Sequence, residues 1–164
     1  MCYFSYIFNH KKETIDTICQ TLSDPEFHGV DFLVGTGLSG TLPMVAVSIQ
    51  SGIPCGIIRK GKEDEQAHSS RLLEPGVSLG HIAARYIIID DLIESGKTVV
   101  GIIEKMRSLY KDSVCIGVIL YQKQTNMSRV REFSKIPLDI PIKQIGNSIT
   151  KLADIRQKEK KSKK

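Results

Sequence analysis

Two neighbouring carboxylates and a hydroxyl-bearing turn lie close together near the middle of the chain. Asp90 and Asp91 directly follow an apolar run, and the turn Ser95-Gly96-Lys97-Thr98 comes shortly after them. A carboxylate pair can bind a divalent cation or accept hydrogen bonds from two sugar hydroxyls. A glycine turn that opens a helix offers unpaired backbone N–H groups and a positive dipole end, which suit a phosphate. A ribose 5-phosphate carries hydroxyls and a phosphate at a separation that fits both groups.

These groups need a strand in front of them and a helix behind them. Tyr86 to Ile89 is a short apolar run, typical of a strand that is covered on both faces. After the turn, apolar residues recur at a helical spacing, at Val99, Val100, Ile102, Ile103 and Met106. Ligands of open α/β sheets bind beyond the carboxyl ends of the strands, where this order places the acids. The simpler alternative is that the acids only cap the helix.

The run I-I-I-D-D-L-I-E-S-G-K-T, from Ile87 to Thr98, resembles the phosphoribosyl diphosphate (PRPP) signature of the type I phosphoribosyltransferases. Ser95 stands where threonine is commoner and keeps the hydroxyl, and Glu94 is longer than the family's usual residue. The resemblance implies an enzyme that moves the 5-phosphoribosyl group from PRPP to a nucleobase, releases diphosphate and uses Mg²⁺. It covers roughly residues 30–121.

The resemblance also implies roles for the residues of this run. Asp90 and Asp91 would hold the ribose hydroxyls and bind Mg²⁺, directly or through water, and with Glu94 they form the expected catalytic set. Leu92 and Ile93 are expected beside the nucleobase. The backbone that would bind the 5′-phosphate belongs to Glu94, Ser95, Gly96, Lys97 and Thr98.

A second glycine-rich turn, Gly35 to Gly40, follows the predicted buried strand Val30–Val34. It resembles the family's pyrophosphate loop, whose backbone N–H groups face the leaving diphosphate. The stretch Gly61–Gly80 corresponds in position to the family's mobile loop, which closes over the site. The residues expected to bind diphosphate are Thr36, Gly37, Leu38, Arg59 and Lys60.

Two sets of residues resemble different branches of the family, which differ in the nucleobase that they use. Glu94 and Lys123 stand where the 6-oxopurine branch of the family carries an acid and a lysine. The turn G-T-G-L-S-G and the run I-R-K look more like the adenine and orotate branches. A purine is the expected acceptor, and residues 122–149 take the place of the family's base-covering hood.

Two other classes stay open. The turn Gly35–Gly40 also fits the dinucleotide fingerprint G-x-G-x-x-G, and the basic pair that ends the next strand could hold a 2′-phosphate, as in an NADP-binding oxidoreductase. That function leaves Asp90 and Asp91 unexplained. The other class is a regulator that binds PRPP or nucleotides on the same fold. A P-loop is excluded, because Gly96-Lys97-Thr98 would require a glycine where Asp91 stands.

Length and charge limit the remaining possibilities. The chain has 164 residues, 41% of them apolar, and a net charge of +5. Six basic residues and one acid from Arg156 to Lys164 supply all of that charge, so a basic nucleic-acid surface is not indicated. No apolar run is long enough to span a membrane. The four cysteines are scattered, which argues against zinc and disulfides and for a reducing cytoplasm.

Alternating strands and helices predict an α/β fold, with a doubly wound, mostly parallel sheet of the phosphoribosyltransferase type and a small C-terminal hood. We expect one domain over residues 1–150, a hood at about 122–150, a basic tail at 151–164, and a homodimer. Helices are expected at 12–22, 41–50 and 98–110. Strands are expected at 3–8, 30–34, 54–58, 86–89 and 114–120.

Overall fold

The computed structural model describes residues 11–59, 73–75, 85–93, 96–122, 140–144 and 150–151. The helices are α2 (Lys11–Leu22), the short 3₁₀ helix η1 (Pro25–Phe27), α3 (Gly37–Ser51) and α4 (Lys97–Leu109). The strands are β1 (Phe32–Gly35), β2 (Cys55–Ile58), β3 (Leu73–Pro75), β4 (Arg85–Asp90), β5 (Val114–Leu120), β6 (Pro141–Gln144) and β7 (Thr150–Lys151).

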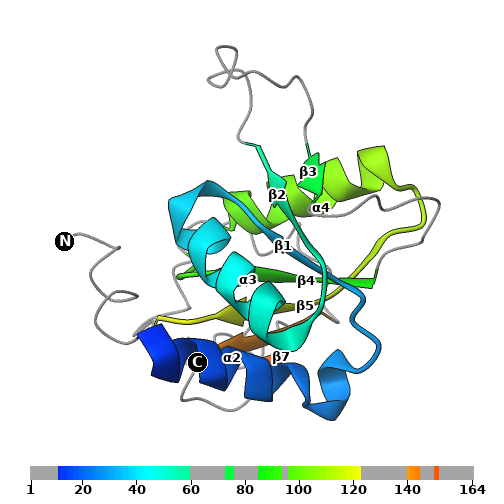
Figure 1. Cartoon of the computed structure of the whole chain (residues 1–164). Coiled ribbons are helices and arrows are strands. Elements are labelled where there is room, and N and C mark those ends of the chain that lie inside the picture. Colours follow the sequence, from blue (N-terminus) through cyan, green and yellow to red (C-terminus); the bar gives the residue numbers. More distant parts are fainter. Residues whose placement is uncertain are drawn as a thin grey trace, which may run out of the picture.

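The described strands form one sheet in the order β3-β2-β1-β4-β5-β6-β7 (Figure 1). Strands β2, β1, β4, β5 and β6 run parallel, and β3 and β7 run antiparallel to β2 and β6. The central strand β4 pairs with β1 through Ile88 and Val34, and with β5 through Ile88 and Val118. The expected mostly parallel sheet is confirmed.

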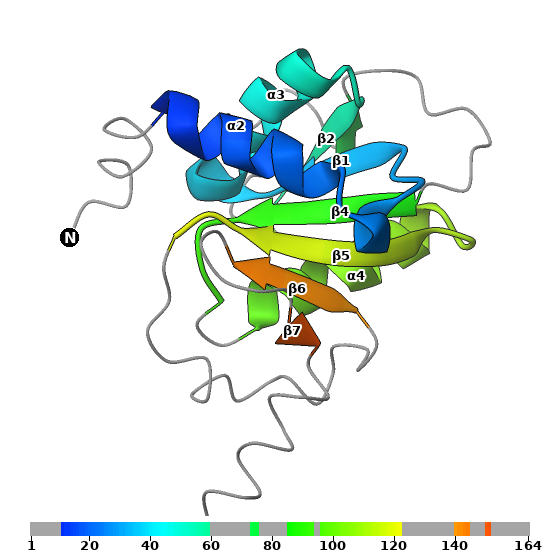
Figure 2. The ribbon, with the colours of Figure 1, turned by 90° about the horizontal axis from the view of Figure 1, so that it is seen from below.

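Helices cover both faces of this sheet, with α2 and α3 on one side and α4 on the other (Figure 2). Successive side chains of a strand point to opposite faces, so β4 contributes to both cores. Ile87 and Ile89 belong to the apolar cluster that includes residues of α2 and α3, whereas Tyr86 and Ile88 belong to the cluster under α4. The doubly wound arrangement is therefore confirmed, together with the doubly covered strand.

Helix α3 starts earlier than the pattern predicted, at Gly37 instead of residue 41. Most of the predicted glycine turn is thus the first turn of the helix. A Cβ on Gly40 would lie 2.9 Å from the carbonyl oxygen of Ile89, and a Cβ on Gly35 would lie 2.8 Å from the carbonyl oxygen of Gly40. The two glycines therefore let the backbone of α3 rest directly on the ends of β1 and β4.

Three described strands, β3, β6 and β7, lie where none was expected. β3 falls within the stretch predicted as a loop, and it pairs with β2 through Glu74 and Ile57. β6 begins at Pro141, a position that proline tolerates because it is the first residue of the strand. It places part of the expected hood in the main sheet. The remainder of the hood, the expected strand at 3–8 and most of the tail lie outside the described residues.

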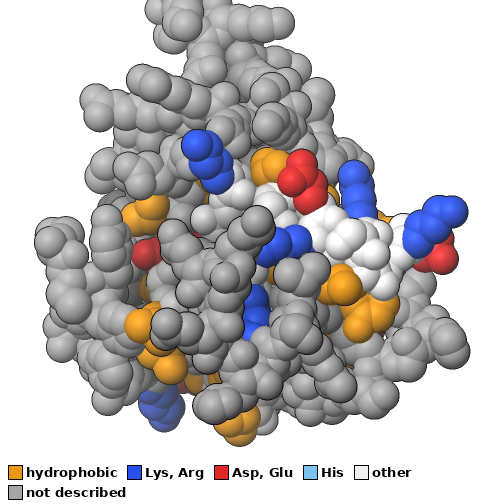
Figure 3. Space-filling view, turned by 90° about the horizontal axis from the view of Figure 1, so that it is seen from above, with side chains coloured by type: hydrophobic (Ala, Val, Ile, Leu, Met, Phe, Trp, Pro, Cys, Tyr) orange, Lys and Arg blue, Asp and Glu red, His pale blue; other side chains and the backbone are white. Residues whose placement is uncertain are grey.

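One face of the molecule carries a mixture of side-chain types (Figure 3). Among the side chains that are coloured in Figure 3, lysine and arginine lie between acidic, apolar and uncharged groups and form no continuous basic patch on that face. Within the described ranges, no helix has both the length and the apolar character that crossing a membrane requires.

Candidate functional site

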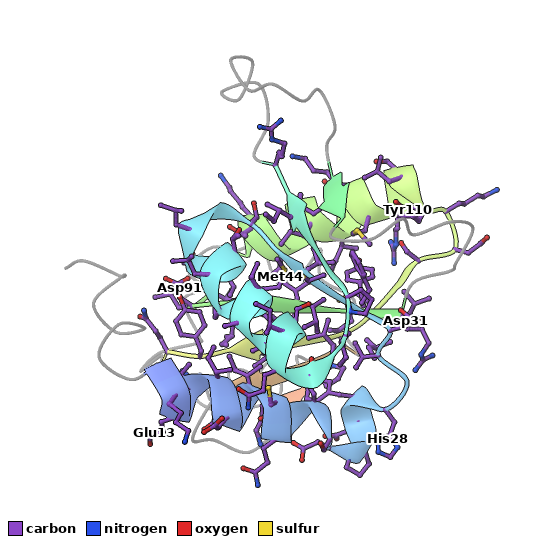
Figure 4. All side chains as sticks on the ribbon, viewed as in Figure 1. Glu13, His28, Asp31, Met44, Asp91 and Tyr110 are labelled. Atoms are coloured by element: carbon purple, nitrogen blue, oxygen red, sulfur yellow. The ribbon has the colours of Figure 1, made fainter. Side chains whose placement is uncertain are left out.

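The two acids lie at the tip of the central strand. Asp90 is the last residue of β4, Asp91 follows it, and the two residues are 5% and 9% exposed. Figure 4 shows Asp91 at the opposite end of the sheet from Asp31. Strands β1, β4 and β5 are parallel, so their carboxyl ends, together with the first turns of α3 and α4, meet at the same edge. This edge is where an open α/β sheet binds its ligand.

The carboxylate of each acid accepts hydrogen bonds at its Oδ1 atom. The Oδ1 atom of Asp90 accepts from the backbone N–H of Asp91 at 3.0 Å and from the hydroxyl of Ser39 at 3.3 Å. The Oδ1 atom of Asp91 accepts from the backbone N–H of Leu92 at 2.9 Å. The backbone of the pair is fixed as well, because Tyr121 and Gln122 donate their N–H groups to the carbonyls of the two acids. The carboxyl groups are thus preorganised at the strand tip.

Burial at this position changes the acidity of Asp90. Loss of solvent, followed by the nearby charge of Asp91, raises the pKa of Asp90 to about 7, although the N–H of Asp91 and the hydroxyl of Ser39 favour the ionised form. Asp90 therefore keeps its proton to a higher pH than an exposed carboxyl group does. A cation or a positively charged sugar beside the pair would favour release of that proton. The negative charge of the pair therefore increases when a positive group arrives.

A buried tyrosine connects the acids to the first turn of α3. The hydroxyl of Tyr121, which follows β5, donates to the backbone carbonyl of Ser39 at 2.9 Å. In a regular helix that carbonyl would accept from the N–H of the residue four positions later, which is Pro43 and has no N–H. Burial, and then the negative charges of Asp91 and Asp90, raise the pKa of Tyr121. Its hydroxyl therefore remains a neutral donor in the physiological range.

The predicted phosphate turn leads into α4 as expected. Gly96 caps the helix with φ +79°, a left-handed conformation that favours glycine, and its carbonyl accepts from the N–H of Val100 at 3.0 Å. Lys97 is exposed and Thr98 is partly buried. The first N–H groups of a helix lack intrahelical partners, so this end suits an anion. Glu94 and Ser95 lie outside the described residues.

The predicted diphosphate residues lie at the same edge. The hydroxyl of Thr36 donates to the carbonyl of Ile58 at 2.6 Å, which ties the end of β1 to the end of β2. Gly37, with φ +60°, and Leu38 are exposed. Arg59 directly follows β2. Its backbone carbonyl accepts a hydrogen bond from the ammonium group of Lys105 of α4. Lys60 lies outside the described residues.

The residues predicted to face the nucleobase are placed differently from one another. Leu92 is partly buried, whereas Ile93 is buried and belongs to the apolar cluster under α4. Ile93 thus anchors the loop after the acids, and Leu92 is the more accessible of the two. Lys123 lies outside the described residues.

Neither the protein-family models nor the curated proteins contain a match to this chain. Solved structures do match. An adenine phosphoribosyltransferase aligns with a TM-score of 0.61 at 17% identity, over 81% of this chain and 78% of the other. The adenine phosphoribosyltransferase of Saccharomyces cerevisiae, complexed with an imino-altritol bisphosphate and adenine, gives 0.61 at 16% identity, over 82% and 76%. The orotate phosphoribosyltransferase of Aeropyrum pernix gives 0.58 at 13% identity, over 93% and 77%.

The chain has the phosphoribosyltransferase fold. Its strand order is also that of dinucleotide-binding sheets, which are built from two parallel βαβαβ halves. Here β3 is short and antiparallel to β2, so the first half of such a sheet is incomplete. The topology therefore disfavours the NADP-binding alternative, although the glycine turn fits its fingerprint.

Asp90 and Asp91 could bind a divalent cation together with oxygen atoms of a ligand. Among the described residues, no cluster of three or more His, Cys, Asp or Glu side chains could hold a metal by itself. Mg²⁺ is commonly held by one or two carboxylates and by phosphate oxygens of a substrate. Asp90 and Asp91 fit that pattern, because they are buried side by side and their like charges repel each other in the absence of a cation.

Two residues of the site were missed in the sequence. Ser39 and Tyr121 were not predicted to be near the acids, yet both form hydrogen bonds within this edge of the phosphoribosyltransferase fold. Pro43 within a helix was a usable signal, because it leaves the carbonyl of Ser39 in need of another donor. The identity of that donor depends on β5 lying beside β4, which local patterns do not specify.

Proposed function

We propose that this protein is a phosphoribosyltransferase, which transfers the 5-phosphoribosyl group from PRPP to a nucleobase, with a purine as the acceptor, and uses Mg²⁺. The observation that carries the proposal is the buried pair Asp90 and Asp91 at the tip of β4, between the first turns of α3 and α4. Solved phosphoribosyltransferases share this fold, which supports the proposal.

The sugar phosphate would bind by its two ends. The first turn of α4, which begins after Gly96, offers N–H groups and a positive dipole end to the 5′-phosphate. Asp90 and Asp91 would accept hydrogen bonds from the 2′ and 3′ hydroxyls. Thr98 would add a hydroxyl donor, and Glu94 and Ser95 would complete the phosphate site. Because the acids face hydroxyls and a cation, they do not oppose the phosphate.

The diphosphate would lie against the first turn of α3. This site would consist of the backbone of Thr36, Gly37 and Leu38 together with Arg59 and Lys60. The left-handed Gly37 lacks a side chain that would hinder close approach of the diphosphate. When bound, Mg²⁺ would neutralise part of the diphosphate charge.

The reaction would place few chemical demands on the protein. The bond between C1 of ribose and the diphosphate oxygen breaks with its electron pair on the oxygen, while a base nitrogen donates its lone pair to C1 from the other face. Positive charge develops on the sugar, and the carboxylates of Asp90 and Asp91 stabilise it. Because burial raises the pKa of Asp90, its carboxyl group must lose its proton to contribute fully, and positive charge nearby favours that ionisation. Glu94 is the proposed acceptor of the proton that the base loses.

The proposal of a purine acceptor is based on two residues of the sequence and on one solved structure with a similar fold. Glu94 and Lys123 occupy positions where the 6-oxopurine branch carries an acid and a lysine. The Saccharomyces cerevisiae structure, with a TM-score of 0.61, contains adenine. The residues at 94 and 123 are the reason to prefer a purine over orotate, because the fold is shared with an orotate phosphoribosyltransferase as well.

The test is a release assay. The full chain is incubated with PRPP, Mg²⁺ and each nucleobase singly, and diphosphate is measured. We expect diphosphate to be released when the nucleobase is a purine and not when it is a pyrimidine. Asp90→Asn and Asp91→Asn should each lower kcat by a factor of about 10²–10³. Asp112→Asn is the matched control, because this exposed acid lies in the turn between α4 and β5, at the other edge of the sheet. A protein that binds PRPP without turnover would favour a regulator, and one without PRPP affinity would contradict the proposal.

A further inference from the structure

A buried glutamine lies at the carboxyl end of β6, two strands away from the strand that carries the acids. Gln144 is the last residue of β6 and is 6% exposed. It follows Ile142 by two positions and therefore shares a face of the strand with it, and Ile142 belongs to the apolar cluster under α4. An aliphatic side chain would suit such a position, because a buried amide costs free energy unless it forms hydrogen bonds. The glutamine therefore indicates a role beyond packing.

The side-chain amide of Gln144 donates to the segment that follows β5. Its Nε2 atom forms a hydrogen bond of 2.9 Å with the backbone carbonyl of Gln122. Strand β6 lies next to β5 (Figure 2), and among the described residues their backbone pairing ends at Leu120 and Gln144. The side chain of Gln144 thus reaches two residues beyond the last backbone pair, and it supplies the donor that the carbonyl of a buried backbone requires.

The backbone of Gln122 is also bonded to the segment that follows β4. Its N–H donates to the carbonyl of Asp91 at 3.0 Å, so both backbone hydrogen-bonding groups of Gln122 have partners. The acids have further support, because β4 pairs with β5 along its whole length and the N–H of Tyr121 donates to the carbonyl of Asp90. Removal of the amide of Gln144 should therefore displace the segment after β5 and leave the acids in place.

We infer that Gln144 is a positioning residue for the nucleobase, because it fixes the residue from which the chain continues to Lys123. This inference rests on the proposed function, in which Lys123 contacts the nucleobase. Gln144 would act only through the backbone of Gln122. A displacement of about 1 Å in a binding group can cost a factor of about 10² in rate. The two phosphate ends of PRPP would bind at the first turns of α4 and α3, so loss of this anchor should affect the nucleobase far more than PRPP.

The experiment is steady-state kinetics of diphosphate release by the full chain. Adenine, guanine, hypoxanthine, xanthine and orotate are first tested singly with PRPP, Mg²⁺ and the wild type, and the nucleobase that supports release is used for the variants. Gln144→Met keeps the length of the side chain and removes the donor. It should raise the KM for the nucleobase about tenfold or more, while the KM for PRPP stays within about twofold of the wild-type value.

A second variant and a control accompany Gln144→Met. Gln144→Leu suits the apolar face of β6 and should give the same result, so it replaces Gln144→Met if far-UV circular dichroism shows that the latter does not fold. Lys143→Met is the matched control, because Lys143 is the preceding residue of β6, points to the other face of the strand and pairs with Asp24 at 3.8 Å. It should leave both KM values within about twofold of the wild type.

The possible outcomes separate this inference from the proposed function. A wild type that releases no diphosphate with any nucleobase refutes the proposed function, and the inference with it. An active wild type whose KM values are unchanged in the Gln144 variants refutes the inference alone. An equal rise in both KM values also refutes it, because it would show a general structural role. A selective rise in the KM for the nucleobase, absent in Lys143→Met, supports it.

Discussion

The hydroxyl of Tyr121 donates a hydrogen bond of 2.9 Å to the backbone carbonyl of Ser39. The contact joins the end of β5 to the first turn of α3, and it supplies the donor that Pro43 cannot provide. The hydroxyl of Ser39 in turn donates to Asp90 at 3.3 Å. The end of β5, the start of α3 and the tip of β4 are thus held by one small network.

Tyr121→Phe should weaken this network without changing the packing volume. The carbonyl of Ser39 would lose its donor, which we expect to lower the free energy of unfolding by about 1–3 kcal/mol. In a Pro43→Ala background the loss should be smaller, because residue 43 then has an N–H that can bond to the carbonyl of Ser39. Urea denaturation of the four proteins in this double-mutant cycle measures the difference. An equal loss in both backgrounds would show that Pro43 does not determine the role of Tyr121.

The protonation of Asp90 should make stability depend on pH. Because the pKa of Asp90 is raised from 3.8 to about 7, the folded protein retains a proton that the unfolded chain releases. The contribution of this proton is complete below about pH 4 and is lost as pH rises toward 7, by at most about 4 kcal/mol. Asp90→Asn should therefore become more stable relative to the wild type between pH 4.5 and 7.5, as measured by urea denaturation. Parallel curves for the two proteins would contradict this expectation.

The left-handed glycine before α4 should matter for the ligand as well as for the fold. Gly96→Ala places a side chain at φ +79°, and we expect it to lower the free energy of unfolding by about 1–2 kcal/mol. Gly52→Ala is the matched control, since Gly52 has φ +74°, caps α3 and has no atom near the position of a Cβ. Both variants should lose similar stability, but only Gly96→Ala should weaken PRPP binding, as isothermal titration would measure. If the two variants bind PRPP with equal affinity, the phosphate does not bind at the start of α4.

A glycine of β5 should be required by its neighbour. A Cβ on Gly117 would lie 2.2 Å from the Cε1 atom of Phe27, which is fully buried. Gly117→Ala should therefore lower the free energy of unfolding by about 1–3 kcal/mol. Gly101→Ala, inside α4 with no atom near its Cβ position, should instead raise it by about 0.5–1 kcal/mol. Thermal and urea denaturation of both variants test this contrast, and equal changes in the two would refute it.

The sequence was most informative where one side-chain pattern had one structural explanation. The run Tyr86–Ile89 is apolar at every position, so it had to be covered on both faces, and the adjacent acids had to lie at its tip. The start of α3 was missed because Gly37 and Gly40 lack large side chains and create no periodicity. The short strand β3 gave no signal either, since an edge strand of three residues depends on β2 to form. The pairing of Tyr121 with Ser39 depends on the order of strands in space.

The glycines at positions 35 and 40 have a thermodynamic consequence. They leave no layer of side chains between the start of α3 and the tips of β1 and β4, so these backbones should shift together. A substitution that displaces the start of α3 would therefore also displace the tip of β4, and its effect on the free energy of unfolding would not be independent of a substitution made at Asp90.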